Sequence, residues 1–258
     1  MPALSLSTLS YLVFLGLAIA SMPVYALLGR RTDPDATRRG TSFLMGTGDF
    51  LVHWFMWFVT PVEKLFLRLG WPPDVFNFAG LGFGLLAGIA IGVGNLPLGA
   101  WMLTLTSVCD IFDGRIARAT RSSSDYGGFL DSTLDRFVES FAFIGFAVFL
   151  RHLPLGPAAA TAALAGSLLV SYARARGESL GVLCKEGLMQ RAERLVLMML
   201  ACLLDGVVVG ATHHQRGRLV FWTMVLIAAG TFLTAVQRTY WISQRLRARD
   251  REKSAGPG

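Results

Sequence analysis

The sequence has few charged residues for its length. Only 16% of its 258 residues are Asp, Glu, Lys or Arg, whereas soluble domains carry about 25%. Hydrophobic residues make up 53% of the chain, and its mean hydropathy is +0.51. This composition excludes an ordinary soluble domain and favours a polytopic membrane protein.

Cysteine is scarce and widely spaced. Cys109, Cys184 and Cys202 form no CxxC pair, and their number is odd. Disulfide frameworks and zinc sites need closely spaced pairs, so we expect free thiols that pack as small apolar side chains.

The first residues lack positive charge, since no Lys or Arg precedes Arg30. The apolar run 4–28 therefore has no basic start and is too long for a cleaved signal peptide. Because about 20 apolar residues cross a bilayer, this run predicts a transmembrane helix.

Long apolar runs continue through the chain, at 74–93, 98–119, 129–150, 158–175, 195–210 and 219–243. They predict an all-α fold, in which a six-helix transmembrane bundle follows one extra N-terminal transmembrane helix. Gly127-Gly128 is expected to break the chain before the third run. The segment Phe50–Leu69 mixes aromatic residues with Glu63, Lys64 and Arg68. It predicts an amphipathic helix in the membrane interface, with aromatics down and charges up.

Three regions follow from this pattern. Residues 1–72 hold the N-terminal transmembrane helix, a basic loop with Arg30, Arg31, Arg38 and Arg39, and the interfacial helix. Residues 73–243 form the six-helix core. Residues 244–258 form a basic cytoplasmic tail, which we expect to be loosely ordered.

The distribution of basic residues predicts the orientation. Only Arg151, Arg216 and Arg218 fall in the outer turns, and the other 21 Lys and Arg fall on the opposite side. By the positive-inside rule, that side is cytoplasmic. The net charge of +7 is then explained by contact with anionic lipid and substrate. We therefore expect no nucleic-acid partner.

Glycine recurs every four residues in the first core run, at Gly80, Gly84, Gly88 and Gly92. Such a stripe lets membrane helices pack closely, and a glycine-lined ligand path is the less favoured alternative.

Four carboxylates stand out in the apolar surroundings. Asp110 and Asp113 are spaced i,i+3, and Asp131 and Asp135 are spaced i,i+4. On helices, either spacing places both acids on one face. Acids at the ends of membrane helices are costly unless compensated, so they mark a functional site. Hard oxygen ligands favour Mg²⁺, Mn²⁺ or Ca²⁺ over zinc.

Arginines follow the first acid pair, and cations beside arginines suit phosphoryl or pyrophosphate chemistry. Gly114 and Gly127 leave room for a nucleotide or serve as packing positions. Ala117 falls one turn after Asp113 on the same face, where a larger side chain would crowd a bound base or sugar.

The motif D-x2-D-G-x2-A-R-x8-G-x3-D-x3-D resembles the signature of the CDP-alcohol phosphotransferase (phosphatidyltransferase) family. It is formed by Asp110, Asp113, Gly114, Ala117, Arg118, Gly127, Asp131 and Asp135. Upstream, many relatives have P-N-x-x-T, whereas this chain has Pro73-Asp74-Val75-Phe76-Asn77, which puts the role of Asn77 in doubt.

The resemblance implies metal-dependent transfer of a phosphatidyl-type group from a CDP-linked lipid to a small alcohol in phospholipid biosynthesis, with release of CMP. It implies a homodimer with Mg²⁺ or Mn²⁺, two ions being expected, and an active site facing the cytoplasm of a bacterial inner membrane. Asp110, Asp113 and Asp131 resemble metal ligands, and Asp135 resembles a general base that also touches metal. The CDP-binding surface is expected at Asp110, Asp113, Gly114, Ala117, Arg118 and Gly127.

The acceptor is predicted less directly. The run S-Y-A-R-A-R-G-E-S-L-G is similar to the subgroup that makes phosphatidylinositol or its phosphate. In that subgroup, basic residues receive the acceptor phosphate. The candidates here are Arg174, Arg176, Lys185, Arg191 and Arg194. The alternative for each of these residues is that it only follows the positive-inside rule and is solvated by lipid headgroups. The alternative acceptor is glycerol 3-phosphate or another small alcohol.

Two acids outside the motif also need partners. Glu139 continues the face of Asp131 and Asp135 by one turn, and we expect it to pair with an arginine on a neighbouring helix. Asp205 is expected to reach the outer interface. A cation-coupled transporter is the competing class, but its acids should lie near the bilayer midplane on interrupted helices.

Overall fold

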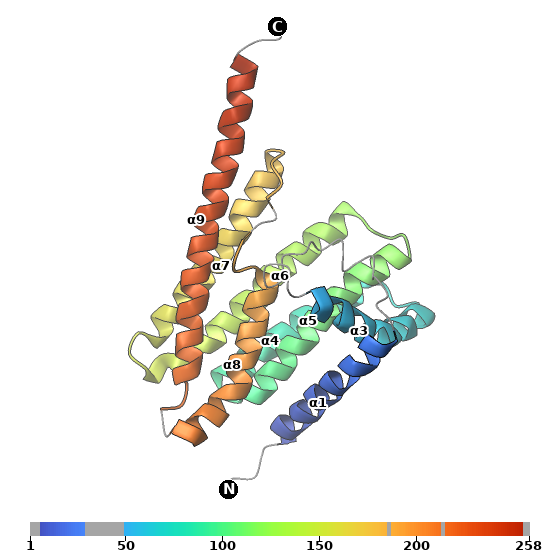
Figure 1. The fold of residues 1–258 in the computed structure, drawn as a ribbon, viewed down its shortest axis with the longest axis vertical. Coiled ribbons are helices and arrows are strands. Elements are labelled where there is room, and N and C mark those ends of the chain that lie inside the picture. Colours follow the sequence, from blue (N-terminus) through green and yellow to red (C-terminus); the bar gives the residue numbers. More distant parts are fainter. Residues whose placement is uncertain (1–5, 29–48, 185–186, 213–214, 255–258) are drawn as a thin grey trace.

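The computed structural model describes residues 6–28, 49–184, 187–212 and 215–254. These residues form α-helices and one short 3₁₀ turn, with no strand among them. Figure 1 shows the order of the elements, which are α1 (Leu6–Leu27), α3 (Asp49–Leu69), α4 (Pro73–Gly92), α5 (Leu96–Ala119), α6 (Asp125–Phe149), η2 (Leu150–His152), α7 (Gly156–Ser179), α8 (Arg191–Thr212) and α9 (Arg218–Ser254). The predicted all-α fold is confirmed.

The bundle has two closely packed groups of helices. In one, α4 packs against both α5 and α6, and in the other α7 runs along α9. The two groups are joined because α8 contacts α5 and α9, while α6 contacts α7. Between them lies a core of almost fully buried side chains, including Phe143, Phe146, Met198, Met224 and Ile227.

Glycines let α4 approach its neighbours. A Cβ at Gly84 would collide with Val138, and one at Gly88 would collide with the carbonyl of Phe141. Gly145 of α6 faces Gly88 in the same close contact. Small residues allow such backbone approach between membrane helices, so the packing role of the stripe is confirmed.

Charge separates the helices into two kinds. Among the described helices, α1, α3, α4, α7 and α9 are long and apolar enough to cross a membrane. The other three, α5, α6 and α8, are 22 to 25 residues long but carry the acids and arginines of the central site. The chain is an integral membrane protein, and the helices that carry its central acids pack against the more apolar ones.

The N-terminal helix is attached to the core by specific contacts. The hydroxyl of Tyr11 shares a hydrogen bond of 2.8 Å with that of Thr104 on α5. Trp101 of α5 donates its indole N–H to Ser10 over 3.0 Å. Tyr11 is only 5% exposed, so α1 packs as part of the fold.

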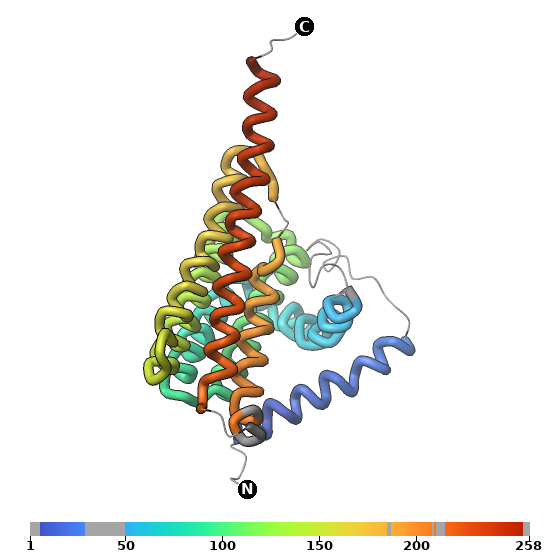
Figure 2. Tube along the Cα trace, turned by 60° about the vertical axis from the view of Figure 1, so that its left-hand side comes forward, coloured from blue at the N-terminus to red at the C-terminus, as the bar shows by residue number. Residues whose placement is uncertain are grey.

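Helix α3 lies across the direction of α9 in both Figure 1 and Figure 2, and its placement in the membrane interface stays a prediction. The expectation that its charged residues all face water is wrong for Glu63. This side chain is buried and meets the guanidinium of Arg115 on α5 at 2.6 Å. The reason is that α5 supplies a buried partner of opposite charge.

Two predicted boundaries differ from the structure. Helix α6 begins at Asp125 and runs through Gly127 and Gly128, because the hydroxyl of Ser124 caps its first turn by accepting from the Gly127 N–H at 3.1 Å. The predicted loose tail is helical as far as Ser254. Figure 2 shows this end of α9 rising beyond the other helices.

The expectation for Asp205 is also wrong. Its carboxylate is 1% exposed and accepts from the backbone N–H of Gly217 at 3.0 and 3.2 Å. It thereby fixes the turn between α8 and α9, at the end of the bundle opposite the acidic motif. A bond of 2.9 Å between the His152 ring and the carbonyl of Arg216 supports the same turn.

Candidate active site

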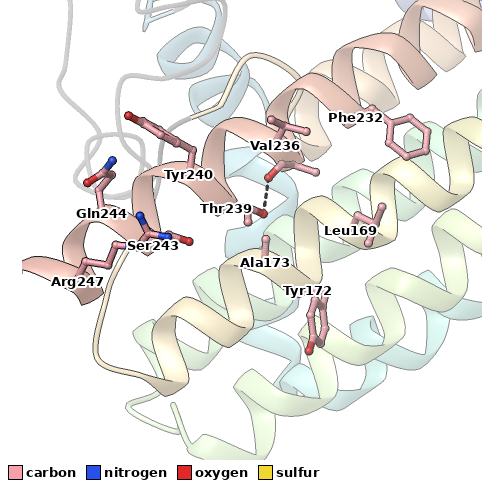
Figure 3. Close-up of a pocket in the computed structure, with 11 residues that line it drawn as sticks. Leu169, Tyr172, Ala173, Phe232, Val236, Thr239, Tyr240, Ser243, Gln244 and Arg247 are labelled. Atoms are coloured by element: carbon pink, nitrogen blue, oxygen red, sulfur yellow. Dashed lines mark hydrogen bonds between the residues drawn. The ribbon is translucent and has the colours of Figure 1, made fainter. Parts of the chain in front are cut away.

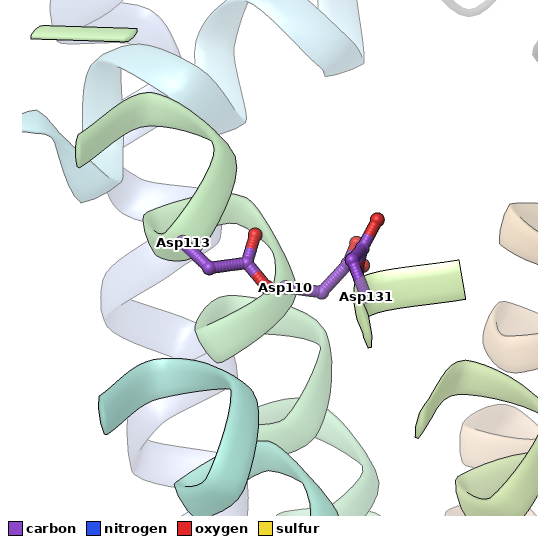
Figure 4. Close-up of side chains that lie close together, drawn as sticks. All are labelled: Asp110, Asp113 and Asp131. Carbon is purple, nitrogen blue, oxygen red and sulfur yellow. The ribbon is translucent and has the colours of Figure 1, made fainter. Parts of the chain in front are cut away.

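Three motif carboxylates gather at one point. Asp110 and Asp113 come from α5 and Asp131 comes from α6, and one oxygen from each lies within 4.8 Å of the others. Figure 4 shows the three side chains converging. Asp113 is buried, and the other two are partly exposed, so the cluster lies at the edge of the packed interior.

Helix α4 forms one wall of this cluster. A small cavity of about 20 Å³ lies beside the acids, and its lining consists of Phe76, Asn77, Gly80, Leu81, Thr106, Asp110, Asp113, Asp131, Leu134, Asp135 and Val138. Thr106 donates to the carbonyl of Gly80 over 3.1 Å, which joins α4 to α5 at this depth. The cavity has room for about one water-sized sphere, enough for an ion but not for a nucleotide.

Asp135 faces the same cavity and shares an ion-pair partner with Asp110. Arg191, the first residue of α8, contacts Asp110 at 2.9 Å and Asp135 at 2.5 Å. The three side chains are 17 to 23% exposed. One guanidinium thus bridges α5 and α6 and balances part of the negative charge there.

The next turn of α8 holds a second, enclosed ion pair. Arg194 contacts Glu139 of α6 at 2.5 Å, and both side chains are 2% exposed. Arg194 also donates to the carbonyl of Met189 over 3.2 Å. The expected pairing of Glu139 with an arginine on a neighbouring helix is confirmed, and it removes Arg194 from the open part of the site.

The expected nucleotide-binding residues follow the acids along α5. The guanidinium of Arg118 lies over Gly114, with Nη1 3.1 Å from the position that a Cβ would occupy. A side chain at residue 114 would therefore displace Arg118. Ala117 is partly exposed on the same part of α5, whereas Gly127 lies in the first turn of α6, one turn ahead of Asp131.

The candidate acceptor residues separate in the structure. Arg191 is at the acidic cluster and Arg194 is enclosed, as described above. Arg174 is exposed and paired with Glu178 at 2.9 Å. Arg176 is exposed and contacts the hydroxyl of Ser179 at 3.5 Å. Lys185 lies outside the described residues.

Arg238 was missed in the sequence. It lies on α9, is 3% exposed and donates to the carbonyl of Val170 on α7 over 3.1 Å. Its guanidinium also lies close to Gly187 in the connection that leads to Arg191. The available signal was an arginine within the apolar run 219–243, since charges there are costly and usually functional.

The donor set fits a divalent metal ion. All donors in the cluster are carboxylate oxygens, which hard cations such as Mg²⁺ and Mn²⁺ prefer, and the structure has placed them close enough to share one ion. The fold and site together define an integral membrane protein with an acidic centre, whose donors suit a divalent cation, at one end of a helical bundle.

Comparison with known proteins identifies the class more closely. Residues 73–236 match the family model of the CDP-alcohol phosphatidyltransferases. The chain therefore belongs to the CDP-alcohol phosphatidyltransferase family, and it is a transferase.

Two curated relatives each match more than two thirds of the chain. An archaetidylinositol phosphate synthase of Methanothermobacter thermautotrophicus is 33% identical over 199 residues, which are 74% of this chain and 91% of the relative. A phosphatidylinositol phosphate synthase of Cutibacterium acnes is 38% identical over 185 residues, which are 70% of this chain and 89% of the relative.

Solved structures of a phosphatidylinositol phosphate synthase from Mycobacterium tuberculosis have the same fold. The form with CDP-DAG bound has a TM-score of 0.62 and 27% identity, covering 71% of this chain and 92% of that one. The form with manganese and citrate has a TM-score of 0.63 and 26% identity, covering 71% and 88%.

Proposed function

We propose that the chain transfers a phosphatidyl-type group from a CDP-linked lipid to a hydroxyl of inositol phosphate, with release of CMP. The observation that carries this proposal is the convergence of acids from α5 and α6 beside Arg191. The names of the relatives support the choice of acceptor, since both are synthases of an inositol phosphate lipid.

Asp110, Asp113 and Asp131 are the proposed ligands of Mg²⁺ or Mn²⁺, with Asp135 as a further ligand and two ions expected. The ions would supply charge neutralisation at the pyrophosphate, where the leaving CMP carries negative charge. By fixing the position of a bound cation, the acids would determine where the pyrophosphate can be held at the mouth of the cavity.

Asp135 is the proposed general base. It lies on the same face of α6 as Asp131, one turn further along, and its carboxylate already forms an ion pair with Arg191. A carboxylate within reach of the acceptor hydroxyl can take its proton as the new ester bond forms. Arg191 would hold that carboxylate in place and present its remaining surface to the acceptor phosphate.

Arg118 and Gly114 are proposed to form the nucleotide side of the site, with Ala117 and Gly127. The guanidinium lying over a residue without a side chain gives a flat cationic surface close to the acids. A planar, five-donor group suits paired phosphate oxygens.

The acceptor phosphate is proposed to bind on the α8 side of the acids. Arg191 is the first candidate because it is partly open and touches both acid helices. Arg238 is buried behind the connection that leads to Arg191, whereas Arg174 is exposed and paired with Glu178, which makes it the weaker candidate. Arg176 and Lys185 remain predictions from the sequence.

We also infer that the acidic end faces the cytoplasm, in a bacterial inner membrane, and that the chain forms a homodimer. The concentration of basic residues at that end supports the orientation. Glycerol 3-phosphate remains the alternative acceptor, because the same arginines can hold its phosphate.

The test is a CMP-release assay on the full-length protein in liposomes that contain CDP-diacylglycerol and Mg²⁺ or Mn²⁺. Inositol phosphate, inositol, glycerol 3-phosphate and serine would be compared as acceptors. We expect release with inositol phosphate at least tenfold faster than with the others. Faster CMP release with glycerol 3-phosphate would overturn the choice of inositol phosphate as acceptor. No CMP release with any of the four acceptors would overturn the proposed transfer from a CDP-linked lipid.

A further inference from the structure

A second cavity lies between α7 and α9, away from the acidic cluster. Its volume is about 570 Å³, within the roughly 300–1,000 Å³ typical of ligand sites. Figure 3 shows Phe232 at one end of the groove and Arg247 at the other. The lining is contributed by Leu169, Tyr172, Ala173, Phe232, Ala235, Val236, Thr239, Tyr240, Ser243, Gln244 and Arg247.

The groove changes from apolar to cationic along its length. Leu169, Phe232 and Val236 form the apolar end, and all three are exposed. Tyr172 and Tyr240, each 67% exposed, come next. Tyrosines of this kind are common where the hydrocarbon meets the headgroups.

Two arginines stand at the polar end. Arg247 lines the groove, and Arg176 falls on the same face of α7 as Tyr172 and Ala173, because it follows them by four and three residues. Both arginines are exposed. Among the described residues, no ion pair involves either of them.

The groove lies on a different face of α9 from the contacts that lead to the acidic cluster. The lining residues of α9 recur every three or four positions from Phe232 to Arg247, so they share one face of the helix. Arg238 and Thr234 fall on the opposite face, where Arg238 meets Gly187 and Thr234 accepts from the N–H of Met189 at 3.0 Å. That connection leads to Arg191 and the acids, and the groove faces away from it.

We propose that this groove binds an anionic membrane phospholipid, with an acyl chain along Leu169, Phe232 and Val236 and its phosphate at Arg176 and Arg247. The length of α9 places these arginines at the depth of the lipid headgroups. About 20 residues of helix cross the hydrocarbon, and counting from Arg218 that distance ends near Arg238. Tyr240 then lies at the boundary, with Arg247 in the headgroup layer.

A second copy of the chain fits this surface less well. In a membrane, a symmetric pair places equal depths of the two copies against each other. If the grooves of two copies packed against each other, Arg176 and Arg247 of one copy would therefore face the same two arginines of the other, and like charges would meet. The nearest acid on the same face of α9 is Asp250, almost one turn further from the membrane. A phospholipid headgroup supplies the missing negative charge at the right depth.

The test compares lipids that differ only in headgroup charge. Purified full-length protein in detergent, with divalent metal chelated, would be titrated with phosphatidylglycerol or phosphatidylcholine of identical acyl chains. Bound lipid would be counted by native mass spectrometry. Each arginine near a headgroup is worth about fivefold in affinity. We therefore expect R176Q/R247Q to lower the phosphatidylglycerol affinity roughly 10- to 30-fold and to leave phosphatidylcholine unchanged.

Two further variants sharpen the result. Arg245→Gln removes the same charge from the opposite face of α9, where Arg245 stacks on Trp241 at 4.8 Å, and it should retain the preference. Ala173→Phe fills the groove and should reduce binding of both lipids. Equal phosphatidylglycerol binding by the native protein, R176Q/R247Q and Arg245→Gln would overturn the proposal. So would a dimer that Ala173→Phe converts to a monomer, because the groove would then be an interface between copies.

Discussion

Arg191 and Arg194 stand one turn apart on α8, and each contacts a carboxylate of α6 at 2.5 Å. Their surroundings differ. The Arg191 side chain is 23% exposed and is shared between Asp110 and Asp135, whereas the Arg194 side chain is 2% exposed and bonds to Glu139. The same chemical pair therefore serves two purposes, one at an accessible site and one inside the bundle.

The two ion pairs differ in which other groups could neutralise the carboxylate if the arginine were removed. Solvent, a metal ion or a substrate phosphate can reach the carboxylates near Arg191. Nothing of that kind can reach Glu139, so its charge depends on Arg194 alone. We call Arg191 with Asp110 and Asp135 the open layer, and Arg194 with Glu139 the enclosed layer. We expect substitutions in the open layer to affect catalysis and substitutions in the enclosed layer to affect folding.

The largest effect is expected from Asp135→Asn in the open layer. The amide cannot accept the proton of the acceptor hydroxyl, and general-base catalysis contributes roughly 10²–10⁴-fold. CMP release should fall by about that factor, while binding of the CDP-linked lipid with metal persists. Retained turnover in this variant would exclude Asp135 as the base.

Arg194→Gln tests the enclosed layer. Removing one partner leaves Glu139 charged and buried, which costs about 3–5 kcal/mol. The thermal midpoint should fall by roughly 10 °C, since 1 kcal/mol shifts it by about 2–4 °C in chains of this size. Because Cys109, Cys184 and Cys202 are free and buried, a thiol-reactive dye can follow unfolding in detergent. A midpoint equal to that of the native protein would show that the pair is unimportant for folding.

Arg191→Gln is the matched change one turn away. A charge-assisted hydrogen bond contributes about 1.5–3 kcal/mol, so KM for the phosphorylated acceptor should rise roughly 10- to 100-fold. The thermal midpoint should change much less than in Arg194→Gln, because water and metal can compensate the exposed acids. If both variants lost the same stability, the distinction between the two layers would fail.

Arg118→Ala is expected to have a smaller effect. It removes a cation from the nucleotide side and leaves the acids intact, so affinity for the CDP-linked lipid should fall about tenfold. Affinity for Mn²⁺, measured separately, should stay within about twofold. A larger loss of affinity for Mn²⁺ than for the CDP-linked lipid would show that Arg118 does not bind the phosphates of the nucleotide.

The sequence predicted the helices well because each core helix needs a long apolar run. It also predicted that Asp110, Asp113 and Asp131 would meet, since the spacing of each pair fixes a helix face. The bridge that Arg191 forms between Asp110 and Asp135 was not predicted, because Arg191 lies on another helix. Helical periodicity specifies a face and a depth, but it does not specify the neighbour on that face.

The same limit explains the errors at Glu63 and Asp205. Glu63 belongs to an amphipathic pattern and Asp205 lies toward the outer end of its apolar run, so an exposed side chain was the ordinary expectation for both. Glu63 instead meets Arg115, and Asp205 accepts from the backbone of Gly217. Gly127 and Gly128 stay helical because Ser124 supplies a cap, a local signal that was present in the sequence.

The central claim is that acids from α5 and α6 form one metal site. It is tested most directly by the binding of Mn²⁺ to purified full-length protein, followed by electron paramagnetic resonance. Asp131→Asn should weaken binding at least tenfold, whereas Asp125→Asn, an exposed acid at the start of the same helix, should bind as the native protein does. Equal Mn²⁺ affinity in Asp131→Asn and the native protein would contradict the claim.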